Sequence, residues 1–165
     1  MAREQPRPDP DSIGRALAVH PGFLFVASLA TAGVLERYAP LPVETRFETS
    51  PVRIGIAVLL VGAILLFAWG SRTFRRHATS VEPGSSPAAL VTDGPFRVSR
   101  NTMYLGLLAV SLAIAAVAGS IWFFAASAAL GAILDRIVIP REEKVMRAAL
   151  GEAYEVYRSR VRRWV

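Results

Sequence analysis

Two short polar clusters hold the residues whose types and spacing could do chemistry. The first is Arg100-Asn101-Thr102, with Tyr104 two residues further on, and the second is Arg141-Glu142-Glu143. Each cluster adjoins a long apolar block. Because ionisable groups at the edge of a membrane span are candidates for function, we take these two clusters as the candidate site.

The first cluster has the composition of an anion site. Asn101 is placed to cap a helix that begins at Thr102, because its side-chain oxygen can accept a hydrogen bond from a free N–H group of the first turn. The start of a helix beside Arg100 attracts a carboxylate or a phosphate through its exposed N–H groups and its dipole. The simpler alternative is a structural cap, with the arginine on a lipid phosphate.

The second cluster places two adjacent carboxylates in the first turn of a helix that Pro140 can start. The helix dipole stabilises acidic residues there, which is one explanation of Glu142 and Glu143. The other explanation is that one carboxylate faces a cationic ligand while its neighbour contacts solvent or Arg141, since adjacent side chains on a helix point about 100° apart. The spacing alone leaves both open.

Composition excludes several other chemistries. The chain has no cysteine, which removes disulfides, thiolate metal sites and a cysteine nucleophile. Its two histidines, His20 and His77, are too few and too far apart for a zinc cluster, so we expect no metal. The formal net charge is +6, but the basic residues flank apolar blocks, and we therefore expect membrane lipids rather than nucleic acid as partners.

The elements that must position the clusters are four apolar blocks in a chain that is 53% hydrophobic. The blocks are Pro21–Leu35, Ile54–Trp69, Met103–Ala118 and Ile121–Leu134. Each is short of the roughly 20 residues that cross a bilayer, so we expect interfacial flanking residues to complete about four transmembrane helices. The alternative, a soluble four-helix bundle, would leave too little polar surface.

The predicted fold is therefore all-α and integral to the membrane. We expect a cytoplasmic N-terminal tail over residues 1–19, two transmembrane helices within 20–71, a cytoplasmic polar loop over 72–102, a transmembrane hairpin within 103–139 turning at Gly119-Ser120, and a C-terminal amphipathic helix within 140–165. Basic residues after the second and fourth spans place both termini in the cytoplasm. Leu150, Tyr154, Tyr157 and Val161 form an apolar-aromatic stripe on the last helix, which runs to about Arg162.

Several linked motifs over about Trp69–Trp164 resemble the isoprenylcysteine carboxyl methyltransferase family and its bacterial relatives. In chain order the motifs are Thr79-Ser80-Val81-Glu82-Pro83, Leu90-Val91-Thr92-Asp93-Gly94-Pro95-Phe96-Arg97, Ser99-Arg100-Asn101-Thr102-Met103-Tyr104-Leu105-Gly106, Glu142-Glu143, Leu150-Gly151-Glu152-Ala153-Tyr154 with Tyr157, and Arg160-Val161-Arg162-Arg163-Trp164.

The resemblance implies a methyltransferase of the bacterial inner membrane that binds S-adenosylmethionine at the cytoplasmic side. It implies a lipid-like or amphipathic acceptor that enters from the bilayer, and it leaves the oligomeric state open. The residues that it places at the cofactor are Arg100, Asn101, Tyr104, Leu105, Gly106, Glu142 and Glu143, with Tyr154, Tyr157 and Arg160 closing the site. The catalytic positions that it implies are Arg100, Glu143 and Arg160.

The chain departs from the family pattern at two places. Many members have Arg-His-Pro where this chain has Arg100-Asn101-Thr102, and a proline precedes the last tryptophan where this chain has Arg162-Arg163. The lost histidine removes a ring that could serve as a donor or a base. This change keeps open a non-catalytic membrane scaffold or regulator of the same fold. A second alternative is a membrane reductase of the sterol-reductase type, because such proteins have a related C-terminal architecture.

Overall fold

A computed structural model describes residues 20–41, 50–77 and 90–165 of the chain, and the regular elements of this part are all helices. The expectations for the N-terminal tail and for Thr79–Pro83 lie outside it. In chain order the elements are α2 (Pro21–Tyr38), α3 (Ser50–Arg76), the 3-10 turn η1 (Gly94–Arg97), α4 (Thr102–Ala118), α5 (Ile121–Ile133), the π turn η2 (Leu134–Val138), α6 (Ile139–Leu150) and α7 (Glu152–Arg160).

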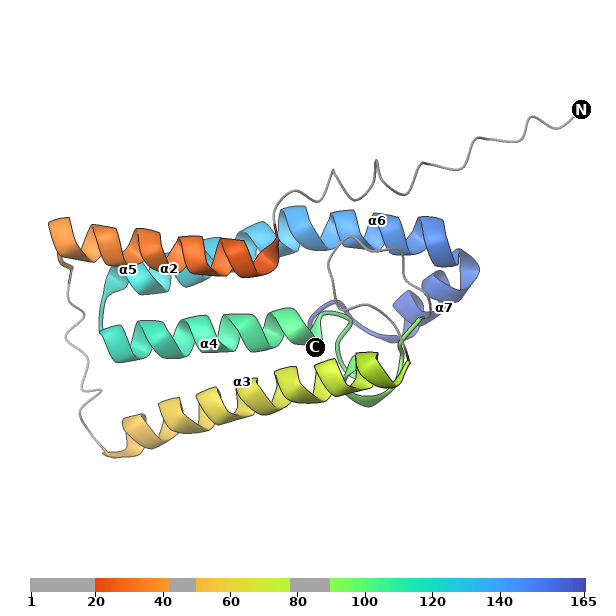
Figure 1. The fold of residues 1–165 in the computed structure, drawn as a ribbon, viewed down its shortest axis with the longest axis horizontal. Coiled ribbons are helices and arrows are strands. Elements are labelled where there is room, and N and C mark those ends of the chain that lie inside the picture. Colours follow the sequence, from red (N-terminus) through yellow and green to blue (C-terminus); the bar gives the residue numbers. More distant parts are fainter. Residues whose placement is uncertain (1–19, 42–49, 78–89) are drawn as a thin grey trace, which may run out of the picture.

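The four helices α2 to α5 run alongside one another (Figure 1). Helix α4 packs between α3 and α5, and α5 in turn packs against α2. Helices α6 and α7 and the loop that enters α4 gather at one end of this bundle (Figure 1). Both predicted polar clusters therefore lie at the same end, as expected for a hairpin of two paired helices.

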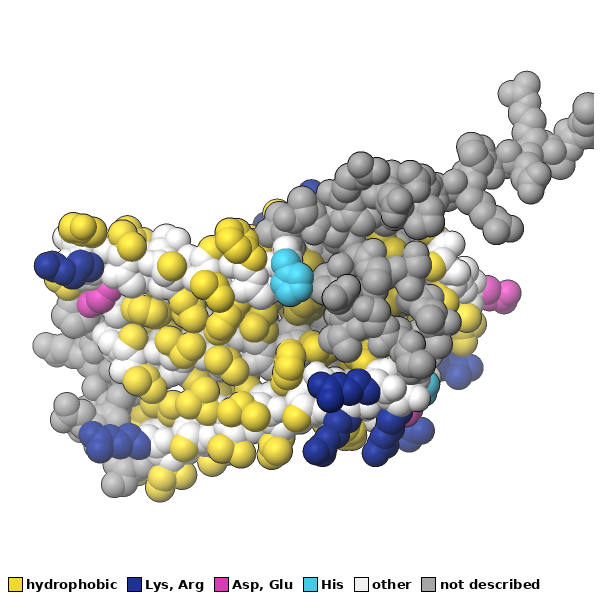
Figure 2. Space-filling view, in the orientation of Figure 1, with side chains coloured by type: hydrophobic (Ala, Val, Ile, Leu, Met, Phe, Trp, Pro, Cys, Tyr) yellow, Lys and Arg dark blue, Asp and Glu magenta, His cyan; other side chains and the backbone are white. Residues whose placement is uncertain are grey.

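The four predicted apolar blocks all form helices, but within the described residues two helical runs are both long enough and apolar enough to span a membrane. Pro51–Arg76 has 26 residues and Ile121–Leu150 has 30, and both are apolar enough to cross a bilayer. Thr102–Ala118 is apolar but shorter. The second run is long because the helical path continues from α5 through η2 into α6. Large apolar side chains of α2 and α3 are exposed on the outside of the bundle (Figure 2), where lipid would cover them.

Helix α4 approaches both of its neighbours closely because it carries small residues on two sides. A Cβ atom at Gly106 would lie 3.3 Å from the backbone oxygen of Ala63 in α3. On the other side, the buried hydroxyl oxygens of Ser111 and Ser127 lie 2.6 Å apart and link α4 to α5. Close backbone approach and interhelical hydrogen bonds are what hold helices together where hydrophobicity cannot.

The predicted turn at Gly119-Ser120 is confirmed. Gly119 has a φ of 57° and ends α4 in the left-handed conformation that glycine adopts without steric cost. Ser120 then caps α5, because its hydroxyl accepts a hydrogen bond from the N–H of Trp122 at 3.3 Å. This two-residue connection makes α4 and α5 antiparallel neighbours.

The C-terminal helix differs from the prediction of a single run to about Arg162. Gly151 has a φ of 54° and separates α6 from α7, so that α7 folds back beside the site. The apolar-aromatic stripe continues past Gly151 and so favours one uninterrupted helix, although a glycine directly after a helical leucine is a common helix end. The break turns Tyr154 and Tyr157 inward, and both are buried.

We predict that Gly106→Leu destabilises the bundle while Gly62→Leu does not. The larger side chain at Gly106 must push α3 away, and overpacking of this kind costs about 1–3 kcal/mol. A Cβ atom at Gly62, on the exposed side of α3, meets nothing within 4 Å. Thermal midpoints of the two variants in the same detergent check this, and equal midpoints would show that the α3–α4 contact is not tight.

Candidate functional site

One cavity lies at the end of the bundle where the two polar clusters meet. Its lining combines apolar and aromatic side chains with a few polar groups, as ligand sites usually do. The lining residues are Phe74, Leu90, Val91, Phe96, Arg100, Asn101, Ile139, Glu142, Glu143, Met146, Tyr154 and Tyr157. Six of the predicted site residues are among them, namely Arg100, Asn101, Glu142, Glu143, Tyr154 and Tyr157.

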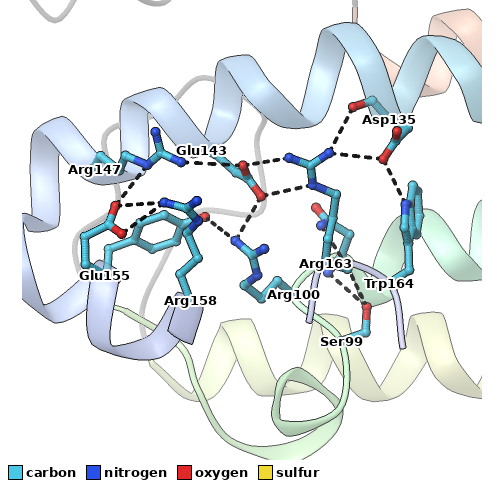
Figure 3. A network of polar contacts seen from close by, with 11 residues as sticks. Ser99, Arg100, Asp135, Glu143, Arg147, Glu155, Arg158, Arg163 and Trp164 are labelled. Carbon is cyan, nitrogen blue, oxygen red and sulfur yellow. Dashed lines mark hydrogen bonds and ion pairs between the residues drawn. The ribbon is translucent and has the colours of Figure 1, made fainter. Parts of the chain in front are cut away.

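The centre of the site is the carboxylate of Glu143, whose side chain is only 8% exposed. Arg100 Nη1 donates to its Oε1 at 2.9 Å, and Arg163 donates to both of its oxygens, from Nε at 3.3 Å and from Nη2 at 3.0 Å (Figure 3). The contact with Arg163 is bidentate, which fixes orientation as well as charge. Glu143 thus joins the start of α4 to the C-terminal end of the described chain.

The segment Val161–Trp164, which we call the C-terminal strap, crosses the start of α4. The backbone N–H of Arg100 donates to the oxygen of Arg162 at 3.1 Å, and Ser99 Oγ donates to the oxygen of Arg163 at 3.2 Å. At the other side of the strap, Trp164 Nε1 donates to Asp135 Oδ1 at 2.9 Å (Figure 3). The strap is therefore fastened to both α4 and η2.

The prediction that the Asn101 side chain caps α4 is wrong. Helix α4 does begin at Thr102, but Asn101 makes no side-chain capping bond. Its Nδ2 instead donates to the backbone oxygen of Arg163 at 3.0 Å, so the amide is used by the strap. The two positions where the chain departs from the family pattern, Asn101 and Arg162-Arg163, therefore meet in space.

Glu142 has a different environment from its neighbour. The hydroxyl of Tyr104 donates to its Oε1 at 2.5 Å, and no cationic group of the described chain pairs with it. Glu142 is partly exposed, and neither carboxylate forms an ion pair with Arg141. Glu142 is thus a carboxylate at the cavity whose charge is not neutralised by an arginine.

One donor at the cavity has no partner among the described residues. The Nε of Arg100 is buried and makes no hydrogen bond, although its Nη1 binds Glu143 and Tyr154 OH. An unsatisfied buried donor is costly, and arginine cannot lose its charge to avoid that cost. The arrangement is suited to an anionic group of a ligand.

The tyrosines of α7 form one wall of the cavity. Tyr157 donates its hydroxyl to the backbone oxygen of Phe96 at 2.7 Å and so holds η1 against α7. Burial raises the pKa of Tyr157 well above its ordinary value, and burial together with the charge of Glu143 raises the pKa of Tyr154. Both phenols are therefore neutral over the physiological range, and Tyr154 OH accepts a hydrogen bond from Arg100 while Tyr157 OH donates one.

Four of the predicted site residues do not line the cavity. Tyr104 reaches the site only through Glu142, while Gly106 packs against α3. Leu105 is partly exposed on the first turns of α4, and Arg160 is exposed at the last residue of α7. The described residues contain no group of three or more side chains that could hold a metal ion.

Asp135 and Arg163 are the polar groups of this site that sequence reasoning missed. Asp135 accepts from Arg163 Nη1 at 3.2 Å as well as from Trp164. It ends an apolar block, and an ionisable residue in such a place is a usable signal. The role of Arg163 had no local signal, because its partners Glu143 and Asp135 are 20 and 28 residues away.

Comparison with known proteins gives one positive finding. A family model described as phospholipid methyltransferase matches residues 52–153, which is more than half of the chain and includes both polar clusters. No curated protein and no solved structure matches the chain.

We predict that Glu143→Gln lowers the free energy of unfolding by about 3–5 kcal/mol, because it leaves the buried Arg100 without its counter-ion among the described residues and removes one of the two carboxylates that pair with Arg163. Glu155→Gln is the matched control. Glu155 also pairs with two arginines, but it is 49% exposed, and its loss should cost less than about 1 kcal/mol. Unfolding by SDS in mixed micelles measures both, and equal losses would contradict a central role for Glu143.

We also predict a pH-dependent effect of Tyr157→Phe. The variant leaves the oxygen of Phe96 without its donor, at a cost of about 1–3 kcal/mol. Because the folded-state pKa of Tyr157 lies above the unfolded value, the contribution of its hydroxyl is fully present below about pH 10 and is lost as the pH rises toward the folded-state pKa. Thermal midpoints from pH 8 to 11.5 should converge above pH 10, and a constant difference would contradict the assignment.

Proposed function

The chain belongs to the phospholipid methyltransferase family, and from this premise we propose that it transfers a methyl group from S-adenosylmethionine to a lipid-like or amphipathic acceptor. The family is the same broad family as the isoprenylcysteine carboxyl methyltransferases, and its members are membrane methyltransferases. The chain is accordingly a membrane protein. The cofactor, the acceptor and the residues that serve them are the parts that we propose.

The observation that carries the proposal is the unpartnered Nε of Arg100 at the start of α4. In this assignment Arg100 binds the carboxylate of the cofactor, assisted by the free N–H groups of the first turn of α4. Asn101 is not needed as the cap and stays with the strap. S-adenosylmethionine supplies an activated methyl group on a sulfonium centre, so that no metal or enzyme nucleophile is required.

We assign the two glutamates to different tasks. Glu142 faces the cavity without a cationic partner, and we place the amino group of the cofactor beside it. Glu143 is occupied by Arg100 and Arg163, so it acts as a positioning residue that holds Arg100 toward the cavity. This refines the expectation drawn from the sequence, in which both glutamates contact the cofactor.

The aromatic side of the cavity would exclude water and admit the apolar acceptor. Phe74 and Phe96 stack edge to face with ring centroids 4.9 Å apart, and Phe74 belongs to the long apolar helix α3. Transfer of a methyl group needs an oriented acceptor in a dry site more than it needs acid–base groups. Arg160 lies on the exposed end of α7, and we leave it without a catalytic task.

We predict that Arg100→Gln weakens binding of S-adenosylhomocysteine about tenfold or more, since a charge-assisted hydrogen bond contributes about 1.5–3 kcal/mol. Glu142→Gln should weaken it through the loss of the charge beside the amino group. Arg158→Gln is the control, because Arg158 is exposed and its one ionic partner among the described residues is Glu155. Calorimetry on the purified protein in detergent measures all three, with folding checked by circular dichroism.

The same preparation tests the function as a whole. Labelled S-adenosylmethionine and a membrane lipid extract should yield a labelled lipid. Cofactor binding without any labelled product would favour a scaffold, and displacement of the bound cofactor by a nicotinamide dinucleotide would favour a reductase. Normal affinity in both the Arg100 and Glu142 variants would overturn the site assignment.

A further inference from the structure

Four exposed arginines lie at the site end of the bundle. They are Arg72, Arg75 and Arg76 of α3 and Arg97 of η1, and we call them the basic surface. None of them forms an ion pair within the described residues. Asp93, the carboxylate next to η1, lies 3.6 Å from His77 instead. Figure 2 shows basic side chains gathered where α3 ends.

Packing between η1 and α3 brings these arginines to one place. The spacing of Arg72, Arg75 and Arg76 puts them on one side of α3, while Gly70 and Thr73 are buried on its other side. Gly94 of η1 lies against α3 so closely that a Cβ atom there would be 3.1 Å from Trp69 Nε1. Arg97, three residues further on, is thereby held beside the end of α3.

The polarity of α3 changes from apolar to basic within one turn at this level. Leu65 is 63% exposed and Trp69 is 54% exposed. The next charged residue along α3 is Arg72, which is also exposed. The same combination of an arginine and an exposed apolar side chain occurs at the end of η1, where Val98, directly after Arg97, is 62% exposed. Exposed tryptophan and apolar side chains beside arginines are typical of the boundary between lipid tails and headgroups.

We propose that the basic surface is a binding site for the phosphate groups of anionic membrane phospholipids. Arginine binds phosphate with two parallel hydrogen bonds, and the apolar side chains beside it would contact the tails of the same lipid. The surface adjoins the cavity but is separate from it, since Phe74 and Phe96 line the cavity while their neighbours Arg75 and Arg97 point into solvent. The site would therefore enrich anionic lipid beside the cavity, whatever the reaction there.

The experiment uses Trp69 as the reporter. The full chain is placed in nanodiscs of neutral lipid containing equal fractions of either brominated phosphatidylglycerol or brominated phosphatidylcholine, because bromine quenches a tryptophan that it touches. The Trp69 signal is the difference between the chain and its Trp69→Phe variant. We expect stronger quenching by the anionic lipid, and equal quenching by the two lipids would overturn the proposal.

Charge variants locate the site. Arg72→Gln combined with Arg76→Gln should lower the relative association constant of the anionic lipid by about fivefold for each arginine removed. The matched control removes two exposed arginines from the opposite end of the bundle, Arg37→Gln with Arg53→Gln, and should keep the preference. A preference that survives the first pair, or is lost with the control pair, would overturn the assignment.

Inorganic phosphate distinguishes the source of the phosphate group. If millimolar phosphate abolishes the preference more strongly than potassium chloride of equal ionic strength, the surface binds a soluble phosphate and the proposal fails. Equal, weak effects of both salts support a lipid site. None of these measurements requires methyl transfer, so their outcome is independent of the proposed function.

Discussion

The site depends on one buried carboxylate, Glu143, which pairs closely with Arg100 and Arg163 and more distantly, at 3.9 Å, with Arg147. Glu143 draws Arg100 from the start of α4 and Arg163 from the strap into a single charge cluster, and Asp135 balances the second arginine. Arg100 and Glu143, the two buried members, would each be expensive to bury alone. Because their partners come from α4, η2, α6 and the strap, the four segments must arrive together for any of the charges to be satisfied. The cluster thus fixes the geometry of the cavity floor.

The ion pairs around Glu143 leave two polar groups at the cavity whose bonding within the described residues is incomplete. Arg100 keeps a free donor, and Glu142 keeps a charge that only a phenol contacts. A zwitterionic ligand, with one carboxylate and one ammonium group, would complement both. In the proposed assignment, the framework and the ligand contacts are divided between neighbouring residues, with Glu143 serving the first and Glu142 the second. Adjacent positions on α6 can differ in this way because they point about 100° apart.

The sequence predicts the helices well and the closure of the site less well. Apolar blocks locate α2 to α5 within a few residues, because long apolar runs have little choice but to form helices in lipid. The apolar blocks do not establish that the chain crosses the membrane four times, because α4 is shorter than the run from Ile121 to Leu150. The sequence predicts that Asn101 caps α4, because capping is a local pattern. The bond that its side chain makes, to the backbone oxygen of Arg163, joins residues more than 60 positions apart and leaves no local pattern. Asp135 and Arg163 were missed for the same reason, as ion pairs between distant segments leave no periodic pattern.

The continuous path from α5 through η2 to α6 has a mechanical consequence. A helical run of 30 residues is about 45 Å long, which exceeds the roughly 30 Å hydrocarbon core of a bilayer. A helix adapts to bilayer thickness by tilting, and here the same helical run carries Glu142 and Glu143 beyond its π turn. The π turn and Pro140 mark the place where the run can bend instead. Any tilt or bend of this run would therefore move the two carboxylates of the site.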